Sequence, residues 1–126
     1  MHIPRPFGFL SKQRIRSAAE FQIVFKQGKR FFAGCFVCHV LKTDRDYARL
    51  GVVTNKRNCR LATDRNRIRR RVREQCRLIQ HQLAGMDVVI ALKSSVEKIT
   101  DQEQAQCIEK LLSQLVARSS ERSSSS

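Results

Sequence analysis

The spacing of apolar residues along this chain of 126 residues predicts helices that alternate with strands. Recurrence every three to four residues is typical of a helix with one buried face, and unbroken runs rich in β-branched residues are typical of buried strands. These patterns predict a helix at 17–28, strands at 34–41 and 48–56, a helix at 65–83, a strand at 87–93 and a helix that begins at residue 100. The predicted order is therefore α-β-β-α-β-α.

This order indicates an α+β fold, a single-domain two-layer sandwich in which helices pack on a small sheet. We expect a basic N-terminal segment at 1–13, the folded domain at 14–118 and a disordered, serine-rich tail at 119–126. No apolar run approaches the roughly 20 residues that span a bilayer, and the N-terminus lacks the apolar core of a signal peptide. We therefore expect a cytoplasmic protein.

The charge of the chain points to a polyanionic partner. Lys and Arg number 25 against 11 Asp and Glu, which leaves a net charge of +14. Self-repulsion of this size strains a compact state unless a polyanion relieves it. Nucleic acid is the first interpretation, and an anionic membrane surface is the second.

The predicted helix at 65–83 concentrates this charge on one side. Residues 65–77 read RNRIRRRVREQCR, in which Ile68, Val72 and Cys76 recur every four positions. At about 100° per residue these three side chains form one apolar stripe, and arginines occupy the opposite side. Residues 56–77 hold ten basic and two acidic residues, a net charge of +8, whereas solvated helices mix the two signs. Docking of the apolar stripe would therefore present a fixed row of guanidinium groups to phosphates.

Other chemistries find less support. The pair Cys35 and Cys38 has zinc-ligand spacing, but it lies in a predicted strand without a second ligand pair, so we expect reduced, structural cysteines and no metal site. The carboxylates are dispersed and the three histidines fall in unrelated elements, so we expect no catalytic residues in the protein. The apolar side of the helix at 65–83 offers short aliphatic residues and a cysteine, which suit a packed core better than a membrane surface.

Several motifs in order resemble the bacterial ribonuclease P protein subunit. The segment RLGVVTNKRNCRLATDRNRIRRRVREQCR carries the basic pair, the loop and the Arg-Asn-Arg helix of that family. The upstream motif is present as Arg14-Ile15, Glu20-Phe21, Val24-Phe25, Gly28 and Arg30, and the downstream Gly-x-Asp-Val-Val occupies 85–89. The resemblance covers residues 7–116.

The resemblance implies a left-handed β-α-β crossover through the Arg-rich helix. It also implies that the chain is a subunit of the endoribonuclease that removes the 5′ leader from precursor tRNA. The catalytic RNA would carry out hydrolysis with Mg²⁺ held mainly by RNA, and the protein would bind that RNA and the leader. We expect neither DNA nor a membrane as a partner. Charge and length leave one alternative open, a structural RNA-binding protein of the ribosomal-protein type.

The family's functional positions can be placed on this sequence. Those that match the helix contacting the catalytic RNA are Arg65, Asn66, Arg67, Arg69, Arg70 and Arg73. Those that match the leader-binding surface are Phe21, Phe25, His39, Lys56 and Arg57. An aromatic residue is common in the family where this chain has His39. Phenylalanines four apart on a helix are more often core residues, so Phe21 and Phe25 could pack, bind the leader, or do both.

Overall fold

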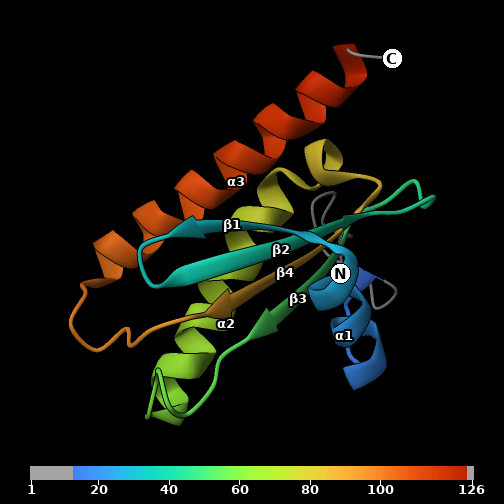
Figure 1. The fold of residues 1–126 in the computed structure, drawn as a ribbon. Coiled ribbons are helices and arrows are strands. Elements are labelled where there is room, and N and C mark those ends of the chain that lie inside the picture. Colours follow the sequence, from blue (N-terminus) through green and yellow to red (C-terminus); the bar gives the residue numbers. More distant parts are fainter. Residues whose placement is uncertain (1–12, 125–126) are drawn as a thin grey trace, which may run out of the picture.

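The computed structural model describes residues 13–124, with side chains as far as residue 117, and forms one sheet and three α-helices (Figure 1). Most of these helices and strands follow from the periodicity of their apolar residues. In chain order the elements are α1 (Ala18–Gln27), β1 (Lys29–Ala33), β2 (Phe36–Lys42), β3 (Arg49–Val53), α2 (Ala62–Leu78), the short 3₁₀ helix η2 (Gln80–Leu83), β4 (Met86–Leu92) and α3 (Asp101–Ser124).

The four strands lie in the order β1-β2-β4-β3. β2 is antiparallel to both of its neighbours, whereas β3 and β4 are parallel and α2 connects them. In Figure 1, α2 lies behind the sheet, and β4 lies to the right of β3 when both strands are viewed pointing upward. The crossover is therefore left-handed, as the resemblance implied, although parallel connections are normally right-handed.

Helices pack on both faces of the sheet, α2 and α3 on one face and α1 on part of the other. Alternate residues of a strand point to opposite faces, so one strand can supply two cores. Val88, Ile90 and Leu92 of β4 belong to the larger core beneath α2 and α3. Val89 belongs to a smaller core with Val24 of α1. The aromatic residues of α1 therefore pack on the face that α2 and α3 leave uncovered.

The α+β class and the single domain are confirmed, but the predicted order lacked β1. This strand begins with two exposed cations, Lys29 and Arg30, and lies at the edge of the sheet. Only one face of such a strand is buried, so its apolar run is too short to resemble a buried strand. The other predicted strands are present with ends shifted by a few residues.

The helices also differ from their predicted ends. α2 begins at Ala62, three residues early, and stops at Leu78 before η2 continues to Leu83. Gly85 follows with φ +83°, a left-handed conformation that favours glycine. α3 continues to Ser124, where we expected a tail beginning at 119. Residues 1–12, which make up nearly all of the predicted basic segment, and residues 125–126 lie outside the described residues.

Candidate nucleic-acid interface

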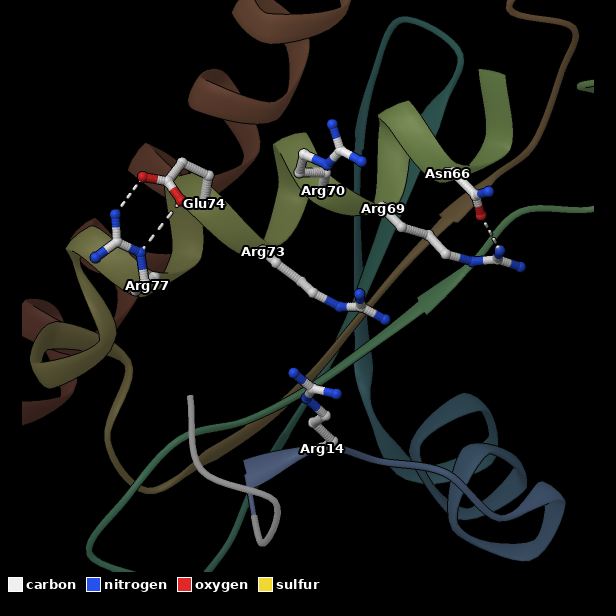
Figure 2. Close-up of a pocket in the computed structure, with 7 residues that line it drawn as sticks. All are labelled: Arg14, Asn66, Arg69, Arg70, Arg73, Glu74 and Arg77. Atoms are coloured by element: carbon white, nitrogen blue, oxygen red, sulfur yellow. Dashed lines mark hydrogen bonds and ion pairs between the residues drawn. The ribbon is translucent and has the colours of Figure 1, made fainter. Parts of the chain in front are cut away.

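A hollow lined by arginines lies along the outer side of α2 (Figure 2). Its volume is about 350 Å³. We call it the arginine hollow, and it is lined by Arg14, Asn66, Arg69, Arg70, Arg73, Glu74 and Arg77. Four of the six positions predicted to contact the catalytic RNA are therefore brought together here.

The packing of α2 holds these side chains outward. Ile68, Val72 and Cys76 are buried against the sheet, as the helical period predicted. The opposite side of a helix must then face away from the core. The remaining wall comes from Arg14, whose backbone bridges Leu50 of β3, and Ile15 N–H donates to the Leu50 carbonyl at 2.9 Å. Arg14 and Arg73 consequently point toward one another from distant parts of the sequence (Figure 2).

The arginine hollow is strongly positive because most of its cations lack acidic partners. Arg14, Arg70 and Arg73 make no ion pair with any described carboxylate, and Arg69 donates to the Asn66 side chain at 3.3 Å. Partial burial lowers the pKa of Arg73, and the nearby positive charges, of which Arg14 is the largest contributor, lower it further. A bound anion would offset both the desolvation cost of the Arg73 charge and the repulsion from its positive neighbours.

The other arginines of α2 are engaged within the protein. Arg65 Nη1 donates to the carbonyls of Cys59 and Arg60 at 3.0 and 2.7 Å, and so closes the loop before the helix. Arg67 and Arg71 face Asp101 at the start of α3, at 3.6 and 3.8 Å. The predicted positions Arg65 and Arg67 therefore lie outside the arginine hollow. At the far end of the helix, Arg77 pairs with Glu74.

Three aromatic residues form a second surface on the α1 side of the sheet. The rings of Phe21 and Phe25 stack with centroids 6.3 Å apart, and Phe25 meets His39 of β2 edge-on at 4.7 Å. We call Phe21, Phe25 and His39 the aromatic row. Gly51 of β3 makes room for it, since a Cβ there would lie 2.5 Å from Phe21 Cε1. Both phenylalanines are half-buried against the smaller core, so they pack and keep an accessible edge.

The aromatic row also has a polar component. Burial lowers the pKa of His39, and the positive charge of Arg30, its cross-strand neighbour, lowers it further. The buried Nδ1 of His39 has no hydrogen-bond partner among the described residues. His39 is therefore held mainly neutral at pH 7, with an unsatisfied ring nitrogen.

The predicted basic pair Lys56 and Arg57 lies apart from the aromatic row. β3 ends at Val53, and both residues are exposed in the turn that follows rather than at the end of the strand. Asn55 shapes this turn, because its side chain accepts from Asn58 N–H at 2.9 Å. No described hydrogen bond or ion pair connects the two cations to Phe21, Phe25 or His39.

Comparison with known proteins identifies the fold and the family. The family model of ribonuclease P matches residues 9–116. The chain is 38% identical to the ribonuclease P protein component of Coxiella burnetii over 118 residues, covering 94% of this chain and 97% of that protein. It is 30% identical to the protein component of Alcanivorax borkumensis over 117 residues, covering 92% and 97%. The chain belongs to the ribonuclease P protein family.

Solved structures of the family share the fold described above. The ribonuclease P protein of Thermotoga maritima superposes with a TM-score of 0.68 at 31% identity, covering 82% of this chain and 96% of that one. That of Staphylococcus aureus superposes with a TM-score of 0.72 at 25% identity, covering 80% and 93%. As a ribonuclease P protein, the chain is a component of a tRNA-processing ribonuclease and works with an RNA subunit.

α1 is fixed on this ribonuclease P fold by a charged network that sequence reasoning missed. Arg49 of β3 pairs with Glu20 of α1 and lies 3.4 Å from Asp87 of β4. Arg45 reaches the same Asp87 carboxylate at 3.3 Å. Burial raises the pKa of Asp87 although both arginines oppose the shift. The network therefore anchors the N-terminal end of α1, which carries Phe21, to the two parallel strands.

Arg14 is the functional candidate that the site prediction omitted. It stood in the quoted Arg14-Ile15 motif, but nothing local indicated that it would face α2.

The five cysteines are free thiols, and burial raises the pKa of Cys76 to about 12. Within residues 13–124, no three His, Cys, Asp or Glu side chains are grouped as metal ligands would be. None of the described helices is both long and apolar enough to cross a membrane.

Proposed function

We propose that the arginine hollow binds backbone phosphates of the catalytic RNA subunit. The planar guanidinium group donates two parallel hydrogen bonds to a phosphate, and this geometry needs a side chain held in place. The buried stripe of α2 holds Arg69, Arg70 and Arg73, and the bridge to β3 holds Arg14. Contact of Arg65 and Arg67 with the RNA stays a prediction, because their guanidinium groups already have partners in the protein.

One observation supports this proposal above the others. On the same helix, Arg67, Arg71 and Arg77 are matched by carboxylates, whereas Arg70 and Arg73 have no described acidic partner. Like charges stacked on a helix destabilise it by a few tenths of a kcal/mol per pair. An unpaired group of cations around a hollow is therefore best explained by an anionic ligand.

We further propose that the aromatic row binds the 5′ leader of precursor tRNA. Single strands are held by stacking of their bases on aromatic side chains along a basic surface. Phe21, Phe25 and His39 supply adjacent rings, and Arg30 supplies a positive charge beside His39. Lys56 and Arg57 are exposed cations, and they would contact backbone phosphates of the leader at nucleotides beyond those that stack on the aromatic row.

In this proposal the protein binds and the RNA performs the chemistry. Hydrolysis would use Mg²⁺ held mainly by RNA, with no catalytic residue in the protein. Several of the described carboxylates support this division, because they are used for structure. Asp87 pairs with Arg45 and Arg49, and Asp101 pairs with arginines of α2. Glu20 and Glu103 accept hydrogen bonds from the hydroxyls of Ser17 and Thr100 at the starts of α1 and α3.

Reconstitution tests the proposed function. The full chain is combined with catalytic RNA, and cleavage of precursor tRNA is measured at a Mg²⁺ concentration at which the RNA alone is inactive. We expect cleavage at the leader junction with the wild-type chain. The variant Arg70→Ala/Arg73→Ala should restore activity only at much higher protein concentration. Tight RNA binding without cleavage would instead indicate a purely structural RNA-binding protein.

A further inference from the structure

A phenylalanine outside the predicted sites lies open on the edge strand β1. The side chain of Phe32 is 50% exposed, whereas its neighbour Phe31 packs against the larger core. The ammonium group of Lys93, just after β4, lies 4.9 Å from the centroid of the Phe32 ring. An exposed cation–π pair contributes only about 0.5–1 kcal/mol, which does not account for a large exposed aromatic ring.

The strand register places Phe32 on the same face as the aromatic row. Phe32 pairs with Val37 and Arg30 pairs with His39, so Phe32 and His39 are diagonal neighbours in antiparallel strands. Diagonal neighbours on one face are about 7–8 Å apart, within reach of aromatic side chains. Lys93 points to this face too, because Leu92 before it points into the opposite core.

α1 covers only part of this face. Its two phenylalanines lie over Gly51 and His39, which belong to one cross-strand row of the sheet. The next row begins with Phe32 and continues through Val37, Ala91 and Val53. In Figure 1, α1 lies at one end of the sheet and the arrowhead of β1 lies at the other. Phe32 therefore extends the aromatic surface beyond the helix toward the edge of the sheet.

We infer that Phe32 and Lys93 form a further nucleotide-binding position for single-stranded RNA, next to His39. This inference rests on the proposed binding of the leader by the aromatic row. A base stacks on the Phe32 ring in place of the Lys93 ammonium group, and that group pairs with the adjoining phosphate. Arg30, exposed on the same face, adds a second cation beside the strand.

The test uses holoenzyme reconstituted from the full chain and catalytic RNA, with precursor tRNAs whose leaders are lengthened one nucleotide at a time. The measured quantity is the dissociation constant of each precursor. Phe32→Ala should match the wild type for mature tRNA and for the shortest leaders, and should bind longer leaders about fivefold more weakly or worse. Phe32→Trp should restore the affinity. Lys93→Ala should lower the log–log salt slope by about 0.7 for long leaders alone.

The matched control is a second exposed apolar side chain, on the opposite side of the sheet. Leu78→Ala removes a similarly exposed apolar side chain from α2 and should change no dissociation constant. Equal affinity of Phe32→Ala and wild type at every leader length would overturn the inference, as would a uniform loss that includes mature tRNA. If Phe21→Ala still weakens precursor binding in that case, the proposed function stands and only the extension to Phe32 is wrong.

Discussion

The arginine hollow and the aromatic row use their side chains in opposite ways. In the hollow, Arg70 and Arg73 project from a helix whose other side makes all the core contacts, so binding and folding depend on different residues. In the aromatic row, Phe21 and Phe25 pack against Val24 and Val89 and are also the side chains proposed to bind the leader. An alanine substitution in the hollow therefore tests binding alone, whereas one in the aromatic row changes both binding and stability.

This difference shows that residue type alone does not reveal whether a side chain stabilises the fold or is open to a ligand. Seven arginines lie between residues 65 and 77, yet some hold loops and helices together and others remain open to a ligand. What separates them is the direction of each side chain around α2 and the neighbour that it meets. Substitutions should separate the arginines that hold the fold together from those that are open to a ligand.

The largest effect is expected for Arg70→Ala/Arg73→Ala in the hollow. Loss of a charge-assisted hydrogen bond costs about 1.5–3 kcal/mol, so affinity for the catalytic RNA should fall by about 3 kcal/mol or more. The free energy of unfolding should stay within about 0.5 kcal/mol of the wild type, because these are surface substitutions. Filter binding and urea unfolding measure the two quantities. If the double variant lost stability as well as affinity, binding and folding would not depend on different residues in the hollow, and the contrast with the aromatic row would fail.

The next effect is expected for Phe21→Ala in the aromatic row. Affinity for precursor tRNA should fall by about 1–3 kcal/mol if the ring stacks on a base, with mature tRNA nearly unaffected. Stability should also fall, because the ring fills the space above Gly51. Circular dichroism must accompany the binding measurement. Equal losses for precursor and mature tRNA would show a core residue with no contact to the leader.

A smaller effect, on the free energy of unfolding, is expected for Arg65→Ala. Arg65 closes the loop before α2, whose N-cap residue Leu61 makes no side-chain capping hydrogen bond. Losing both contacts should lower the free energy of unfolding by about 1 kcal/mol. Arg60→Ala is the control, since Arg60 is highly exposed and its guanidinium group pairs with Glu97 alone among the described residues. Equal unfolding midpoints for the two variants would contradict this structural role.

The smallest effect concerns pH and His39. Its pKa is lowered from an ordinary value of 6.5, so the fold favours the neutral ring. The stabilising contribution is complete above the unfolded value and is lost as the pH falls through the lower folded value. The free energy of unfolding should therefore decline as the pH falls below about 7, and less so in His39→Phe. Parallel curves for the two proteins would exclude His39 as the source.

The arginine hollow was largely predictable because it depends on local geometry. A helical period fixes which side chains of α2 share a side, so Asn66, Arg69, Arg70 and Arg73 could be grouped from spacing alone. At about 100° per residue Arg67 falls at another edge of the helix, but only the structure shows Asp101 opposite it. Arg14 reaches the hollow through its bridge to β3, a contact far apart in sequence that no local pattern records.

The aromatic row and the edge of the sheet were less predictable for the same reason. Whether Phe21 and Phe25 face a core or a ligand depends on how α1 docks, which the Arg49 network and Gly51 decide. Strand β1 begins with exposed cations and lacks the run of buried residues that predicts a strand, so neither the strand nor Phe32 stood out. Local signals are more dependable: Ser17 and Thr100 each stand three residues before a glutamate, and their hydroxyls accept from the backbone N–H groups of Glu20 and Glu103 at the starts of α1 and α3.

The central claim is tested most directly by the salt dependence of binding to the catalytic RNA. The slope of log affinity against log salt concentration is compared for wild type, Arg73→Ala and Lys110→Ala, an exposed cation of α3 that supplies the matched loss of charge. The account predicts that Arg73→Ala lowers the slope by about 0.7 to 0.9 and that Lys110→Ala leaves it unchanged. Equal slopes for wild type and Arg73→Ala would contradict the assignment of the arginine hollow to RNA.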